Sequence, residues 1–155
     1  MTATLLQATD DIGSVIYNAW TATGAATENV QLVWPNRKRE LDRGPQSGLD
    51  KGKPYGRVRW DHSDGGQKSL ASPSGTRRFE RIGLLIVEIW VAKGTGTDDK
   101  YSLAQVMVDA LETARRTTNG VVFQNVRLRD VPEDEVEGPL TRVDVLCDFR
   151  YDEVK

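Results

Sequence analysis

The only histidine has two carboxylates beside it, a combination that could carry acid–base chemistry. His62 follows Asp61 and precedes Asp64, and Gly65-Gly66 comes directly after them. The glycine pair indicates a turn, and a histidine among carboxylates in a polar turn is usually a surface feature. We therefore expect no enzyme and keep an acid–base site at His62 as the alternative from that class.

Two further candidates for chemistry fit structural roles. Cys147, the only cysteine, alternates in phase with Val145 and Phe149, which predicts a small core residue and not a nucleophile. Gly94-Thr95-Gly96 lacks the third glycine of a dinucleotide fingerprint, and Asp98-Asp99 stands where phosphate would bind. One cysteine and one histidine cannot build a Cys/His metal cluster within one chain. We expect a tight turn at Gly94, no cofactor and no metal.

The composition limits the classes of protein that the chain can belong to. It has 155 residues, 38% of them hydrophobic, which fits one domain with an ordinary core. A formal net charge of −2 argues against a dedicated nucleic-acid binder, which usually has a basic excess. There is no apolar stretch of about 18 residues and no signal peptide pattern at the N-terminus. We expect a soluble, unexported protein without a membrane contact.

The segment from Arg78 to Thr118 predicts a central strand followed by an amphipathic helix. Residues 82–92 are apolar except for Glu88, so both faces of this strand should be covered. Leu85, Val87, Ile89 and Val91 share one face, whereas Ile86, Glu88 and Trp90 share the other. A second apolar face indicates a curled sheet or a partner subunit. The predicted helix ends near Gly120, and its apolar arc should pack on the Leu85 face; that arc contains Leu103, Val106, Met107, Ala110, Leu111 and Ala114.

The remaining periodicities predict an α+β fold in one domain, 1–155, with a mainly antiparallel sheet and two helices on one face. A helix is expected over 4–23 and strands over 30–34 and 55–60. A long charged arm, mobile or ordered only against a neighbour, should occupy about 35–54. After the second helix we expect a strand over 121–131, bulged near Gln124-Asn125, and a hairpin partner over 140–151. The predicted order is α-β-arm-β-β-α-β-β.

Two segments carry opposite charge. Residues 36–59 hold eight basic and three acidic side chains, whereas 130–138 hold five acids and no base. Such runs usually only solubilise a loop, but they could also be complementary surfaces between copies of the chain, with Ile86 and Trp90 adding apolar contact. The candidate contact residues are Arg37, Lys38, Arg39, Arg43, Lys51, Lys53, Glu133, Asp134, Glu135, Glu137, Ile86 and Trp90.

The order of elements and several local strings resemble the tail terminator proteins of long-tailed bacteriophages and their prophage relatives. After an amphipathic N-terminal helix, the resembling pieces are Pro54-Tyr55-Gly56-Arg57-Val58-Arg59, Gly75-Thr76-Arg77, Val91-Ala92-Lys93-Gly94-Thr95-Gly96, the helix 103–116 and a closing hairpin that ends in Phe149-Arg150-Tyr151-Asp152-Glu153. The arm over 37–53 is longer and more charged than in typical members. The family has no residue-level functional motif to transfer.

This resemblance implies a structural virion protein. The chain would form a ring, commonly a hexamer, that caps the tail tube and faces the head connector, with DNA passing through without specific binding. It would be found at the head–tail junction of the virion, and in the host cytoplasm before assembly. The alternatives are a head-completion or adaptor protein of the same joint and, from other classes, a small enzyme or a nucleic-acid-binding domain.

Overall fold

The computed structural model describes residues 2–22, 30–35, 54–68, 75–94, 98–132, 135 and 138–155. Their elements follow the predicted order, and most of the predicted arm lies outside these residues. The elements are α1 (Leu5–Ala22), β1 (Gln31–Val33), β2 (Tyr55–Gln67), β3 (Arg78–Ala92), α2 (Asp98–Ala114), β4 (Val122–Val131) and β5 (Leu140–Val154).

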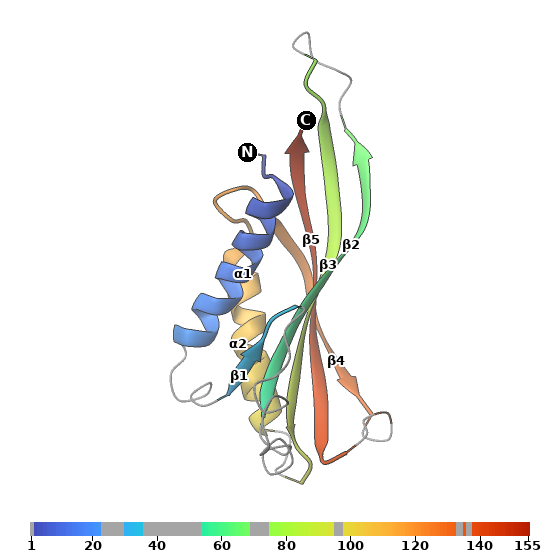
Figure 1. Ribbon diagram of the computed structural model, residues 1–155. Coiled ribbons are helices and arrows are strands. Elements are labelled where there is room, and N and C mark those ends of the chain that lie inside the picture. The colour runs from blue at the N-terminus through green and yellow to red at the C-terminus, as the bar shows by residue number, and fades with distance from the viewer. Residues whose placement is uncertain are drawn as a thin grey trace, which may run out of the picture.

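The described strands form one five-stranded sheet in the order β1-β2-β3-β5-β4. Only the short β1 is parallel to its neighbour, and the other pairings are antiparallel. The long strands twist around one another, and both helices lie on the same side of the sheet (Figure 1). The predicted α+β architecture, with β3 as a central strand, is confirmed.

The core lies between the helices and the predicted face of β3. Leu85, Val87, Ile89 and Val91 are buried there with Met107 of α2. The apolar stripe of α1 enters the same cluster through Ala8, Ile12, Ile16 and Trp20. Cys147 is also fully buried in this cluster, as its phase in β5 predicts. Burial of this one apolar face is therefore what attaches the two helices to the sheet.

Side-chain hydrogen bonds set the start of α1, and a backbone conformation sets the end of α2. The Gln7 backbone N–H donates to Thr4 Oγ1 (3.2 Å) and the Thr4 N–H donates to Gln7 Oε1 (2.9 Å), a reciprocal capping box at the start of α1. α2 ends at Ala114, earlier than predicted, because Arg115 itself adopts a positive φ of 29°. Gly120, with φ 97°, belongs instead to the turn that leads into β4.

The predicted turn at residues 62–66 is wrong. β2 continues through His62, Gly65 and Gly66 and pairs with β3 as far as Gln67 opposite Phe79. The register shifts between His62 and Asp64, so a bulge takes up one residue while the strand continues. The long partner β3 supplies hydrogen-bonding groups along this whole stretch, which outweighs the weak strand propensity of the glycines.

Gly83 of β3 leaves space for the Phe149 ring and for the backbone of β2 beside the bulge. A Cβ atom at this position would lie 2.3 Å from Phe149 Cζ and 2.6 Å from the Asp61 carbonyl oxygen. Only glycine therefore lets the Phe149 ring pass over β3 at this point. The His62 ring then packs edge-on against Phe149, with 5.3 Å between the ring centroids.

Replacement of Ile89 by Ala tests the assignment of the core face. Ile89 is fully buried, so the I89A variant should lose about 2–5 kcal/mol of unfolding free energy, the usual range for a buried large-to-small change. Urea denaturation followed by circular dichroism measures this loss. Leu6→Ala is the matched control, because Leu6 is exposed and its loss should change the free energy by less than about 0.5 kcal/mol. Equal effects of the two substitutions would contradict the assignment.

Candidate functional site

The face of the sheet opposite the helices carries a row of charges across four strands. Glu88 of β3 lies directly opposite Asp144 of β5 in the register. Arg57 of β2 is the cross-strand neighbour of Glu88, and Arg129 of β4 is the neighbour of Asp144. The row thus places two acids in the centre of the sheet with a base on either side. Like charges in directly opposed positions destabilise a sheet, so these two carboxylates need compensation.

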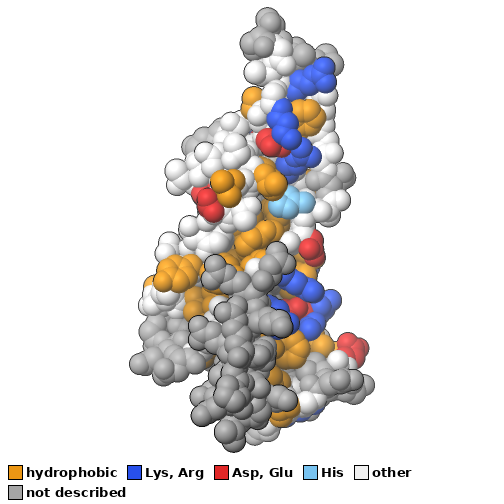
Figure 2. Space-filling view, in the orientation of Figure 1, with side chains coloured by type: hydrophobic (Ala, Val, Ile, Leu, Met, Phe, Trp, Pro, Cys, Tyr) orange, Lys and Arg blue, Asp and Glu red, His pale blue; other side chains and the backbone are white. Residues whose placement is uncertain are grey.

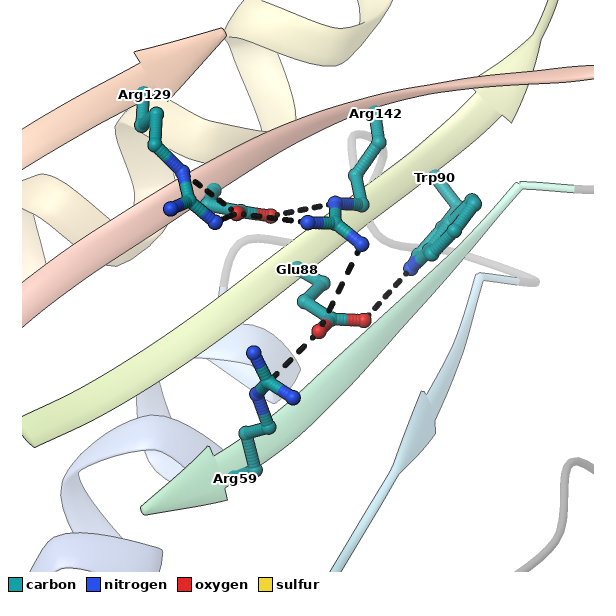
Figure 3. Close-up of polar contacts among 6 residues, drawn as sticks. Arg59, Glu88, Trp90, Arg129 and Arg142 are labelled. Carbon is teal, nitrogen blue, oxygen red and sulfur yellow. Dashed lines mark hydrogen bonds and ion pairs between the residues drawn. The ribbon is translucent and has the colours of Figure 1, made fainter. Parts of the chain in front are cut away.

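Glu88 is 3% exposed and receives contacts from three elements (Figure 3). Trp90 Nε1–H donates to Glu88 Oε2 at 3.1 Å. Arg59 Nε lies 3.4 Å from Glu88 Oε1, and Arg142 Nη1 lies 4.0 Å from the same oxygen. One neutral donor and two guanidinium groups therefore offset the cost of burying this charge.

Asp144 is fully buried and contacts two arginines, Arg129 and Arg142. Arg129 Nε donates to Asp144 Oδ2 at 3.2 Å, and Arg142 Nη2 donates to the same oxygen at 3.2 Å. Arg142 Nε lies 2.9 Å from Oδ1, but this close approach lacks the alignment of a hydrogen bond. Asp144 Oδ1 is thus compensated by charge alone. Arg142 contacts both buried acids and links the two halves of the cluster.

Within each ion pair described on this face, the base is more exposed than the acid. Arg129 and Arg59 have side chains that are 53% and 49% exposed above Asp144 and Glu88. The same holds for Arg127 with Asp148 and for Arg150 with Glu80. The less exposed carboxylates therefore hold these four arginines in place, while about half of each arginine side chain stays exposed to solvent. Such fixed donors suit carboxylate or phosphate groups of a partner.

A second group of ion pairs continues toward the C-terminal end of β5. A hydrogen bond from Arg78 lowers the pKa of Asp152. Burial would raise the pKa of Glu153, but hydrogen bonds from Arg81 and Lys155 outweigh it, so this pKa is also lowered. Figure 2 shows the lysine and arginine side chains of this end in a column near the top of the molecule. These partly exposed pairs contribute little stability each but set the charge pattern of the surface.

His62 lies beside a hollow of about 440 Å³ and not in a turn. Its Nε2 is 3.1 Å from Tyr151 Oη, and the hollow is also lined by Ser63, Arg81 and Glu153. Partial burial lowers the pKa of His62, Arg81 lowers it further, and Asp61 opposes both effects. Arg81 is already bound to Glu153 at 3.0 Å, so the hollow offers a neutral imidazole and a phenol rather than a free cation.

Cys147 lies in the core, as the sequence predicts, and its thiol is not activated. Burial raises the pKa of the Cys147 thiol to about 11, so the thiolate is scarce at neutral pH. Within the ranges that the structure describes, no three His, Cys, Asp or Glu residues are placed to hold a metal ion. No helix among these same residues is long and apolar enough to cross a membrane.

Most of the predicted contact residues lie outside the described ranges. These are Arg37, Lys38, Arg39, Arg43, Lys51, Lys53, Glu133, Asp134 and Glu137. Glu135 is exposed, Trp90 is half-buried and stacks on Tyr55, and Ile86 is only 6% exposed within the single chain. Sequence reasoning missed Asp144, Arg129 and Arg142, although the isolated acid in the apolar strand 82–92 already indicated a partner on an adjacent strand.

Comparison with known proteins supports the fold. No model of a known protein family matches the chain, and no curated protein matches it. One solved structure, of a protein whose name states no function, has a TM-score of 0.58 and 12% identity over 92% of this chain and 94% of that chain. A chain from the virion of a native gene transfer agent (GTA) particle has a TM-score of 0.51 and 11% identity, over 94% of this chain and 97% of that chain. Likeness at these identities establishes a shared fold and nothing further.

Replacement of Arg142 by Met tests the role of the buried acids. The R142M variant should lose about 3 kcal/mol of unfolding free energy, the low end for breaking a buried pair, because Arg129 still contacts Asp144. Arg150→Met is the matched control and should cost at most about 1 kcal/mol, since Arg150 is exposed and Glu80 keeps Lys68. Urea denaturation measures both variants. Similar losses would show that the central cluster is no more important than a surface ion pair.

The lowered pKa of His62 predicts a pH dependence of stability. The unfolded chain binds a proton near pH 6.5 and the folded chain does so only at lower pH, so unfolding becomes easier as the pH falls below 6.5. His62 is the only histidine. The lowered pKa values of Asp152 and Glu153 change the stability only at more acidic pH, near and below the ordinary pKa values of 3.8 and 4.5 for these groups. Urea midpoints measured on both sides of pH 6.5 should therefore differ in the parent. They should differ less in His62→Gln, and an unchanged difference in that variant would refute the assignment.

Proposed function

We propose that this chain is a structural protein of a phage-like particle, a ring subunit that caps the tail tube and joins the tail to the head connector. The proposal combines the fold with the sequence resemblance to tail terminator proteins. It assigns no catalytic role to His62 or Cys147. We propose further that the ring is a hexamer that acts as a tail terminator.

One observation carries the proposal: the fold corresponds to that of a virion chain along almost the full length of both proteins. The match covers 94% of this chain and 97% of the chain from the GTA virion, so it is not limited to one common motif. The TM-score of 0.51 comes with only 11% identity, so the two chains share a fold while their sequences differ at most positions.

The surface chemistry is consistent with an assembly role. The helix-free face presents fixed arginine groups, which favours contact with acidic surfaces of partner proteins. Arg59 and Arg129 each keep a buried acid, so neither pair adds net charge, and their contacts with a partner depend on short-range hydrogen bonds more than on long-range attraction of duplex DNA. In this proposal DNA passes through the ring without specific binding, and the protein partners are the tail tube protein and the head connector.

Electron microscopy of particles made without the protein tests the proposal. Loss of a terminator should give tails of uncontrolled length, because nothing stops the growing tube. Supplying the chain in trans should restore a uniform length, which is the control. Normal tails that fail to join heads would instead identify a head-completion or adaptor protein. Normal, fully joined particles would overturn both assignments.

A further inference from the structure

A groove on the helix side of the sheet lies beside the short strand β1. It has a volume of about 720 Å³ and is lined by Trp34 and Pro35 after β1, by Trp60 of β2, and by Gly13 and Tyr17 of α1, among others. The Tyr17 side chain is 56% exposed although it borders this aromatic surface. Trp34 and Trp60 are half-buried, and partly exposed aromatic groups gathered in a groove are typical of a protein contact.

The groove adjoins an open strand edge. β1 pairs only with Tyr55, Gly56 and Arg57 of β2, and Pro35 follows soon after it. Between Val58 and Ser63 no described strand pairs with the outer side of β2, which forms the margin of the sheet in the upper half of Figure 1. An open edge beside an apolar groove can accept another strand, whose alternate side chains would enter the groove.

The opposite end of the sheet has a second open edge with a matching surface. β4 pairs only with β5 among the described strands, and past Phe123 its outer side has no described strand. Leu128 of β4 is 44% exposed, and its register partner Val145 belongs to the helix-side core. Leu128 therefore lies on the same side of the sheet as the groove, as does the exposed Tyr101 of α2, whose hydroxyl donates to Asp130 of β4.

Strand direction also matches between the two edges. β2 is antiparallel to β3, β3 to β5 and β5 to β4, so β2 and β4 run in opposite directions. Copies related by rotation about an axis along the strands would thus bring β4 beside β2 in the more stable antiparallel arrangement. On the helix-free face, the exposed Asp61 has no described ion pair, whereas Arg127 and Arg129 are exposed on β4.

We infer that β4 of one copy adds to the open edge of β2 of the next copy, with Leu128 entering the groove formed by Tyr17, Trp34 and Trp60. The two surfaces differ and lie at opposite ends of the sheet, so the contact is head to tail and generates a ring when the rotation closes. This inference rests on the proposed ring and names the surfaces that build it. With Leu128 beside Trp60, the antiparallel register sets Arg127 beside Asp61 and Arg129 beside Arg59, and the acids that already bind Arg59 and Arg129 offset their repulsion.

Chemical cross-linking between two introduced cysteines tests this inference. A chain with Tyr17→Cys and Leu128→Cys, treated with a short bismaleimide, should give a ladder of covalent multimers. The native Cys147 is buried with its pKa raised to about 11, so it should not react. The pair Leu6→Cys with Leu128→Cys is the matched control, since Leu6 is exposed on α1 but does not line the groove. A ladder of equal extent in the control, or none in the test pair, would overturn the inference.

Native mass spectrometry separates this inference from the proposed ring. Leu128→Asp should raise the subunit concentration needed for assembly at least about tenfold, because a leucine buried in the contact becomes a charge. Leu6→Asp should leave it unchanged. If the parent assembles and Leu128→Asp assembles equally well, the ring stands and the β2–β4 contact is wrong. If the parent stays monomeric in the native mass spectra and also fails to assemble when purified tails are added, both the ring and the contact are wrong.

Discussion

The compensation of two carboxylates in the middle of the sheet constrains the whole helix-free face. Glu88 and Asp144 lie opposite each other on the two central strands, and both are buried. Without Arg59, Arg129 and Arg142 they would repel each other in a poorly solvated site. Arginines from the outer strands are therefore committed to this cluster, and β2 and β4 must keep the register that supplies them. The outward layer of guanidinium groups is a consequence of that internal requirement.

The two sides of the sheet then have separate roles. The helix side holds the apolar core, so its stability depends on burial of the Leu85 face under α1 and α2. The helix-free side holds charge pairs that contribute less stability but fix which groups face a partner. The open edges of β2 and β4 are a third feature, since they remain unpaired by described strands in the single chain. Such a division would suit the proposed assembly role, because contacts between copies could then form without disturbing the core.

Most of the architecture could be predicted from periodicity, and the errors have local causes. The apolar alternation of β3 and β5 and the stripes of α1 and α2 are long enough to be unambiguous. The turn at Gly65-Gly66 was predicted from residue type, but pairing with β3 kept these residues in a strand. Likewise Gly120 was expected to end α2, whereas Arg115 took the positive φ. In both places a tertiary or backbone requirement outweighed the conformational preference of glycine, which is worth about 1 kcal/mol or less.

The sequence by itself determined which residues are apolar, at which period they recur and where the charges stand. This suffices for the elements, the central position of β3 and the buried state of Cys147, because alternation and helical spacing are local properties of the chain. Only the tertiary structure decided that Asp144 lies opposite Glu88, that Arg129 and Arg142 compensate them, and that His62 contacts Tyr151. These contacts join residues far apart in the chain through strand order and register. A single residue of slip would turn each side chain to the other face of the sheet, so no local pattern can specify them.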